Sequence, residues 1–157
     1  MTENRKMRVL IVDDEPLGRK MVRRMLESYS EVELIGECEN GEEAIQEIES
    51  KKPDLVFLDV QMPVLDGFAV LSKINQDKLP FIIFVTAYDE YALRAFEVNA
   101  LDYLLKPSDR KRFDQAFQRA VKQINSQNNN QLNEKIISLL SGNNHPKDFT
   151  ERFVIKT

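Results

Sequence analysis

The sequence predicts an α/β fold: a doubly wound, five-stranded parallel sheet with helices on both faces. Apolar runs rich in Val, Ile, Leu and Phe alternate five times with stretches of helical periodicity. Four of these runs are continuously apolar, which is typical of strands covered by helices on both sides. Crossovers between parallel strands are right-handed, so five strand–helix repeats build one open sheet.

The first half of the chain contains three of the strands and two helices. The strands are predicted at 7–12, 32–36 and 54–60, and the helices at about 16–28 and 42–50. Pro16 suits the first position of a helix, because its missing N–H would have no helical partner there. The apolar residues of this first helix recur at helical spacing and are expected to form its inner face: Leu17, Met21, Val22, Met25 and Leu26.

The second half repeats the pattern after the turn MPVLDG at 62–67. A helix is predicted from Phe68 to Ile74, a strand at 81–86, a helix at 89–97, a strand at 101–105 and a long helix beginning at Asp109. The long helix carries one apolar stripe: Phe113, Ala116, Phe117, Ala120 and Ile124. This stripe is expected to cover one face of the sheet.

The composition changes after about Ser126. The segment QNNNQ at 127–131 has almost nothing to bury and is predicted to be a linker. A short amphipathic helix is expected between 132 and 140, and RFVIKT at 152–157 alternates like the first strand of another domain. The expected organisation is therefore a flexible N-terminus at 1–6, one domain at 7–125, and at 126–157 a linker with a short helix and the first strand of a truncated output domain.

Charge and composition exclude several classes of protein. The net charge of −4 argues against a nucleic-acid-binding domain, which normally carries a basic face. The longest apolar run, Phe81 to Val85, is far too short to cross a bilayer. A single cysteine, Cys38, excludes an internal disulfide and fits a reducing compartment. We therefore expect a cytoplasmic protein that does not contact a membrane.

Reactive side chains follow the predicted strands. Asp13 and Asp14 come after the first strand, Asp59 after the third, Thr86 ends the fourth, and Lys106 follows the fifth. In an open parallel sheet, ligands bind outside the carboxyl ends of the strands. Three neighbouring carboxylates require a compensating cation, and Mg²⁺ suits a site that also holds phosphate oxygens. With a lysine and a hydroxyl beside them, the set favours phosphoryl transfer, with Asp59 as the nucleophile.

Each of these residues has an ordinary structural explanation when taken alone. An aspartate after a strand is often a turn former or a helix cap, and a single lysine is usually solvated. Their coincidence at four strand ends of one repeating pattern is what favours a functional site.

Three segments resemble the bacterial response-regulator receiver domain, over about 7–123. They are LIVDDEP at 10–16, DLVFLDVQMPVLDG at 54–67 and FVTAYDEYALRAFEVNALDYLLKP at 84–107. The resemblance implies a flavodoxin-like sheet with the strand order 2-1-3-4-5 and five helices. It also implies a signalling domain that catalyses only its own phosphorylation and dephosphorylation, rather than a classical enzyme.

The resemblance assigns roles to individual residues. It makes Asp59 the phosphoacceptor, and it makes Asp13, Asp14, Asp59 and the backbone carbonyl of Gln61 the ligands of Mg²⁺. Thr86 and Lys106 would contact the phosphoryl group.

Three further aromatic and proline positions follow from the same resemblance. Tyr103 would move together with Thr86 as a switch, and the peptide bond between Lys106 and Pro107 is expected to be cis. Gln61 and Tyr88 would flank the approach of the hydrolytic water. The bulk of Tyr88 predicts slow self-dephosphorylation.

The resemblance also implies the partners. The phosphoryl donor would be a sensor histidine kinase, and a homodimer would form through the face of the fourth helix, fifth strand and fifth helix. Residues 91–100 resemble receivers joined to LytTR-type DNA-binding domains, the LytR/AlgR group, and RFVIKT resembles the opening strand of such a domain. DNA would then be contacted only through a missing C-terminal domain. A stand-alone receiver that binds a protein target is the alternative.

Two other classes of protein fit the sequence less well. A phosphatase of the haloacid-dehalogenase type carries its nucleophile after the first strand and a second Asp two residues later, whereas position 15 here is Glu. A flavodoxin-like flavin carrier needs a phosphate-binding loop after the first strand, and the acidic residues 13–15 would repel a phosphate.

Overall fold

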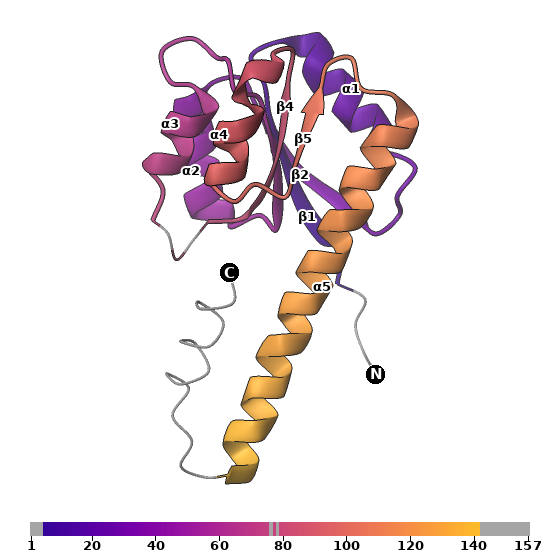
Figure 1. Ribbon diagram of the computed structural model, residues 1–157, viewed down its shortest axis with the longest axis vertical. Helices are drawn as coiled ribbons and strands as arrows, with labels where there is room; N and C mark the ends of the chain where they lie inside the picture. The colour runs from indigo at the N-terminus through magenta and orange to yellow at the C-terminus, as the bar shows by residue number, and fades with distance from the viewer. Residues whose placement is uncertain (1–4, 76, 78, 142–157) are drawn as a thin grey trace. The chain divides into compact units, whose positions relative to one another are not determined.

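The predicted parallel sheet is confirmed. The computed structural model describes residues 5–75, 77 and 79–141. Five parallel strands form one sheet in the order β2-β1-β3-β4-β5 (Figure 1). The strands are β1 (Met7–Val12), β2 (Val32–Cys38), β3 (Leu55–Leu58), β4 (Phe81–Thr86) and β5 (Asp102–Leu105).

Five α-helices cover the two faces of this sheet. They are α1 (Pro16–Leu26), α2 (Gly41–Lys51), α3 (Gly67–Ser72), α4 (Ala92–Glu97) and α5 (Arg110–Ser141). Figure 1 shows α2, α3 and α4 on one face, and α1 with the first turns of α5 on the other. Side chains of Asn40, Asp66 and Asp109 accept hydrogen bonds from backbone N–H groups at the starts of α2, α3 and α5. These caps satisfy donors that a helix leaves unpaired.

The core has one layer on each side of the sheet. Alternate residues of the central strands point to opposite faces, as Leu58 and Phe57 of β3 do. Leu58 belongs to a cluster with Ile48 of α2 and Phe68 of α3. On the other face, the Phe57 ring stacks on Phe113 of α5, with ring centroids 5.3 Å apart.

The strand register brings the carboxyl ends of β1, β3 and β4 together. Val12 pairs with Leu58, and Leu58 pairs with Phe84. The residues that follow β1 and β3 are consequently neighbours, and the N–H of Asp59 donates to the carbonyl of Val12 at 2.9 Å. This edge of the sheet carries the residues singled out from the sequence.

Two helices differ from those expected, one in its buried face and one in its extent. In α1 the buried stripe is Gly18, Val22 and Leu26 at a spacing of four, whereas Leu17 is 78% exposed. Leu17 lies one residue, or about 100°, off that stripe. The helix predicted at 89–97 is divided into a 3₁₀ turn, η2 (Asp89–Tyr91), and α4.

The linker predicted at 127–131 is helical in the structure. The helix that starts at Arg110 continues through these residues to Ser141, so the short helix expected at 132–140 is not separate from it. Asn and Gln cost a helix only about 0.5 kcal/mol each, and neither Gly nor Pro interrupts 110–141. The first glycine after Arg110 is Gly142, just beyond the end of the helix.

Two compact units divide the chain, Met1–Ala120 and Val121–Thr157. The first unit contains the sheet, α1 to α4 and the apolar start of α5, in which Phe113, Ala116, Phe117 and Ala120 are buried. In the second unit, α5 runs from Val121 to Ser141. The segment RFVIKT lies outside the described residues.

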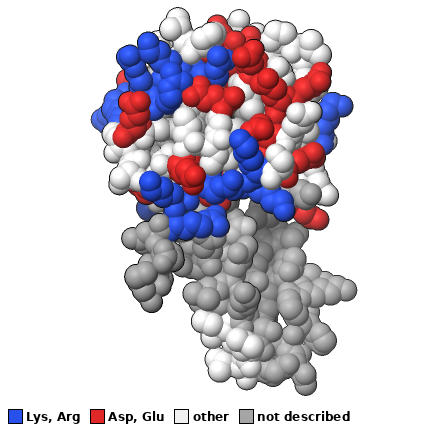
Figure 2. Space-filling model, turned by 180° about the vertical axis from the view of Figure 1, so that it is seen from behind, with Lys and Arg blue, Asp and Glu red and all other residues white. Residues whose placement is uncertain are grey.

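The surface carries charges of both signs. On the face seen from behind, basic and acidic side chains of the described residues lie interspersed (Figure 2). Within the described part of the chain, no helix is both long and apolar enough to cross a membrane.

Candidate functional site

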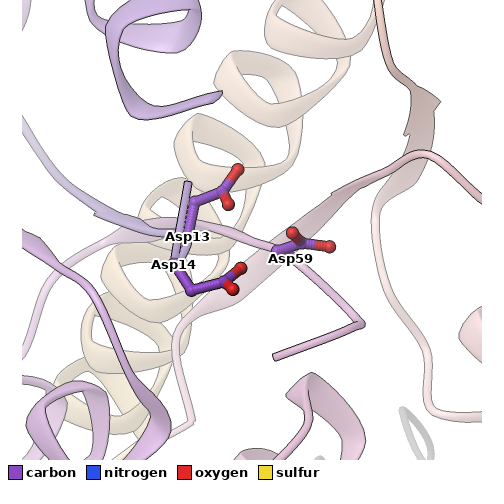
Figure 3. Close-up of side chains that lie close together, drawn as sticks. All are labelled: Asp13, Asp14 and Asp59. Carbon is purple, nitrogen blue, oxygen red and sulfur yellow. The ribbon is translucent and has the colours of Figure 1, made fainter. Parts of the chain in front are cut away.

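Three carboxylates converge at the carboxyl edge of the sheet. Asp13 and Asp14 directly follow β1, and Asp59 directly follows β3. One oxygen from each lies within 4.8 Å of the others, a grouping that could hold a metal ion, and Figure 3 shows the three side chains gathered together. Asp13 and Asp59 are buried, whereas Asp14 is partly exposed. The donors are all carboxylate oxygens, the ligands that hard divalent cations such as Mg²⁺ prefer.

Lys106 supplies a positive charge to this cluster. Its Nζ lies 2.8 Å from Asp13 Oδ2, 3.1 Å from Asp59 Oδ2 and 2.8 Å from Glu15 Oε1. The backbone holds the lysine there, because its N–H donates to the carbonyl of Thr86 at 2.8 Å. The peptide bond between Lys106 and Pro107 is cis, the isomer that the resemblance implies.

Burial and mutual repulsion perturb the ionisation of the cluster. Burial, together with the charge of Asp13, raises the pKa of Asp59 to about 6 against the opposing effect of Lys106. Burial disfavours the charged form of Lys106, but its hydrogen bonds to Asp13 and Glu15 outweigh this and raise its pKa. A carboxylate that is costly to ionise in the metal-free protein gains most from a bound cation.

Thr86 carries an unpaired hydroxyl at the same edge. The residue is completely buried at the end of β4. Among the described residues, its Oγ1 is the buried side-chain atom that has no hydrogen-bond partner. Leaving a buried donor unsatisfied costs about 1–3 kcal/mol, so this hydroxyl is available to a ligand oxygen.

Two glycines allow the chain to approach the cluster closely. A Cβ on Gly18 of α1 would lie 2.1 Å from Asp13 Oδ2 and 3.1 Å from Lys106 Nζ. A Cβ on Gly67 of α3 would lie 2.6 Å from the backbone carbonyl oxygen of Asp59. The sequence prediction missed both glycines as site residues, although a glycine inside a helix is a signal that something packs against it.

Glu15 was also missed as a partner of the cluster. Its carboxylate binds Lys106, and this hydrogen bond lowers the pKa of Glu15. Nothing in the local sequence shows this contact, since 91 positions separate the two residues.

Gln61 lies beside the cluster and is hydrogen-bonded through both its backbone and its side chain. Its backbone N–H donates to Asp59 Oδ1 at 3.2 Å, and its side-chain Nε2 donates to Tyr91 Oη at 2.8 Å. Tyr88 is 43% exposed, and its carbonyl accepts a hydrogen bond from the hydroxyl of Tyr103. The structure thus places Tyr91, which the sequence prediction did not single out, in direct contact with Gln61.

A pocket of about 450 Å³ adjoins this edge. It is lined by Asp14, Val60, Gln61, Met62, Pro63, Asp66 and Tyr91. One ligand candidate of the cluster, Asp14, thus forms part of the pocket wall.

Comparison with known proteins identifies the family. Residues 9–118 match the model of the response regulator receiver domain. The chain is 46% identical over 112 residues to the transcriptional regulatory protein BtsR of Escherichia coli strain K12, covering 71% of this chain and 47% of that protein. An uncharacterized response regulatory protein of Yersinia pestis is 46% identical over 123 residues, covering 78% of this chain and 52% of the relative. The chain spans about half the length of the curated relatives it matches.

Solved structures agree with this assignment. The response regulatory domain of mrkE from Klebsiella pneumoniae is 32% identical, with a TM-score of 0.69 over 76% of this chain and 99% of that one. The receiver domain of AraT from Geobacillus stearothermophilus is 34% identical, with a TM-score of 0.67 over 77% of this chain and 98% of that one. The chain therefore belongs to the response-regulator receiver domain family.

Proposed function

We propose that this receiver accepts a phosphoryl group on Asp59 from a sensor histidine kinase, with Mg²⁺ bound by Asp13, Asp14, Asp59 and the backbone carbonyl of Gln61. The observation that carries the proposal is the convergence of three carboxylates, one lysine and one unpaired buried hydroxyl at a single sheet edge. Each of these groups has a task in phosphoryl transfer, where positioning and charge neutralisation supply most of the catalysis.

The transfer itself requires one nucleophile and several charge-stabilising groups. An Asp59 carboxylate oxygen attacks the phosphorus of a phosphohistidine, the P–O bond forms, and the P–N bond breaks with its electron pair remaining on the imidazole. The backbone N–H of Gln61 and Nζ of Lys106 hold Asp59 in place for this attack. When bound, Mg²⁺ neutralises the charge of the transferring group. Lys106 is placed to take a phosphoryl oxygen after transfer.

Thr86 and Tyr103 would transmit phosphorylation to the surface. The free hydroxyl of Thr86 would donate to a phosphoryl oxygen, and its movement would allow the half-buried Tyr103 to turn inward. Tyr103 would then leave the carbonyl of Tyr88, which accepts its hydroxyl in this structure. Such a change is a population shift between two packings and requires only a few kcal/mol of differential contact.

The responding surface would be the face of α4, β5 and α5, through which we propose a homodimer. Three large apolar side chains are exposed on α4 and β5: Leu93, Phe96 and Leu105 are 71%, 79% and 45% exposed. Within α4, only Ala95 is buried. Exposed apolar side chains of this kind favour an interface.

The output would be transcriptional regulation. Several relatives are named transcriptional regulatory proteins, and the match covers only 47% of their length. Together with the LytTR-like pattern of residues 91–100, this supports a cytoplasmic receiver, with no membrane contact, that belongs to a longer LytTR-type regulator. DNA would be bound by a C-terminal domain, following a segment at 126–157 that leads into it. The alternative is a stand-alone receiver that acts by phosphorylation-dependent protein binding.

Intact-mass measurement with a small phosphodonor tests the phosphorylation. Acetyl phosphate and Mg²⁺ should add one phosphoryl group to the wild type, and Asp59→Asn should prevent the addition. EDTA should also prevent it. An unmodified wild type under these conditions would contradict the proposed function.

Size exclusion distinguishes the two outputs. Beryllofluoride with Mg²⁺ mimics the phosphorylated aspartate, and a dimer that forms only with this mimic would favour the transcriptional regulator. A protein that remains monomeric would favour the stand-alone receiver.

We also propose, for either output, that the side chain of Tyr88 screens the acyl phosphate from water. Tyr88→Ala should therefore shorten the lifetime of the phosphorylated protein.

A further inference from the structure

One hydrogen bond links the loop after β3 to the turn before α4, beside the acidic site. Gln61 Nε2 donates to Tyr91 Oη at 2.8 Å, and both residues line the 450 Å³ pocket. We propose that Tyr91 is a positioning residue, which fixes the Gln61 carboxamide across the pocket and thereby slows hydrolysis of the aspartyl phosphate. The inference rests on the proposed phosphorylation of Asp59.

Gln61 is close enough to Asp59 for its orientation to matter. Its backbone N–H donates to Asp59 Oδ1, so its side chain begins directly beside the carboxylate that would carry the phosphoryl group. The side chain is exposed, and an exposed glutamine ordinarily samples several rotamers. The bond to Tyr91 selects one of them, in which the donor group of the amide is already engaged.

Tyr91 is itself held firmly enough to act as an anchor. Its ring is partly buried and lies 6.1 Å from the ring of Phe68, whose own ring lies 5.0 Å from that of Phe84 in the core. The centroid of the Tyr88 ring lies 6.3 Å from that of Tyr91, with the two rings nearly perpendicular. Tyr91 therefore reaches Gln61 from a ring packed against the buried aromatic cluster.

The same turn is tied to the proposed switch residue. The carbonyl of Tyr88 accepts the hydroxyl of Tyr103, so β5 is bonded to the turn that carries Tyr91. Tyr103 thus binds the start of the turn at the carbonyl of Tyr88, and Tyr91 at the end of the same turn binds Gln61. The position of Gln61 is thereby connected to the side of the molecule where output is expected.

Hydrolysis is the step on which this pair would act. A water oxygen attacks the phosphorus, the P–O bond to Asp59 breaks, and its electron pair remains on the carboxylate. The water gives up its protons to the departing phosphate and to solvent. A carboxamide fixed across the pocket obstructs the water, whereas a released one gives it access and a mobile hydrogen-bonding group.

Phosphorylated lifetimes of three variants test the pair. Tyr91→Phe keeps the ring and removes the hydroxyl, and Gln61→Ala removes the amide. Each should shorten the half-life about fivefold, the rate equivalent of one ordinary hydrogen bond. The double variant should be no faster than the faster single variant, because both substitutions break the same interaction. Glu90→Gln, a polar change in the same 3₁₀ turn, is the matched control and should leave the lifetime unchanged.

A second measurement reports on the hydrogen bond without phosphorylation. In the NMR spectrum of the metal-free protein, Tyr91→Phe should shift the side-chain amide pair of Gln61 and leave other glutamine side-chain amides in place. An unchanged Gln61 resonance contradicts the inference, as do unchanged or longer lifetimes or single effects that multiply in the double variant. A wild type that cannot be phosphorylated at all contradicts instead the proposed function.

Discussion

Lys106 Nζ lies 3.1 Å from Asp59 Oδ2, although 47 positions separate the two residues. The same nitrogen contacts Asp13 and Glu15, so a single ammonium group serves three carboxylates. In the metal-free protein this ammonium group offsets the repulsion between the two buried carboxylates of Asp13 and Asp59. This relationship makes the stability of the domain depend on the charge balance of its site.

Removing the lysine should destabilise the metal-free protein. Lys106→Met leaves Asp13 and Asp59 buried without their counter-charge, which should lower the free energy of unfolding by about 2–4 kcal/mol. Urea unfolding at pH 7 with EDTA measures this loss. Addition of Mg²⁺ should recover part of it. Lys20→Met, at an exposed position of α1, is the control. Equal midpoints for the two variants would rule out the stabilising role of Lys106.

The ionisation of Asp59 should weaken the metal-free fold as the pH rises. Burial and Asp13 raise its pKa from the ordinary 3.8 to about 6, so the folded protein holds this proton more tightly than the unfolded chain. Its favourable contribution is complete below pH 3.8 and is lost as the pH rises through about 6. Asp59→Asn should therefore raise the free energy of unfolding at pH 7 by about 1–3 kcal/mol. The difference in free energy of unfolding between Asp59→Asn and wild type should shrink towards pH 4. A difference that does not change with pH would show that it does not arise from the ionisation of Asp59.

Gly18 should be required for the geometry of the acidic cluster. The Cβ of Gly18→Ala would overlap Asp13 Oδ2 and crowd Lys106 Nζ, so Asp13 must move. We expect the affinity for Mg²⁺ to fall by about tenfold or more, as is usual when the support of a ligand is disturbed. Isothermal titration measures the affinity. Lys20→Ala, also in α1, controls for the effect of alanine on the helix, and an affinity equal to that of wild type would show that Asp13 adapts without cost.

Val64 should be a site at which substitution stabilises the protein. It has a positive φ of 70° and is 99% exposed, in the loop between β3 and α3. A β-branched residue rarely adopts this conformation, and it loses no burial on replacement. Val64→Gly or Val64→Asn should raise the free energy of unfolding by about 1 kcal/mol, and with it the thermal midpoint. Val64→Ala keeps a Cβ and should gain less. A lower midpoint for the glycine variant would show that the valine is not strained.

The sequence was sufficient to predict the sheet and the group of residues at its edge. Continuously apolar strands and their order along the chain place Asp13, Asp59 and Lys106 at neighbouring strand ends, because parallel strands all finish at the same edge. The convergence of the carboxylates follows from topology, and topology depends on patterns that the sequence displays directly.

The sequence could not predict the contacts that depend on tertiary packing. Tyr91 meets Gln61 across the gap between two loops, and Glu15 reaches Lys106 from the start of α1. Leu17 was expected to be buried but is exposed, because the buried face of α1 is shifted by one residue from the expected one. The helical state of 127–131 was missed because a polar composition was taken as evidence for a linker, whereas polar residues without Gly or Pro are compatible with the continuation of a helix that is already formed.

Peptide mapping after borohydride reduction tests the phosphorylation of Asp59 most directly. Borohydride converts an aspartyl phosphate into homoserine, which marks the modified residue permanently. After incubation with acetyl phosphate and Mg²⁺, we expect homoserine at position 59 and aspartate unchanged at positions 13 and 14. Homoserine at another position, or at none in a protein whose fold is intact, would contradict the role of Asp59.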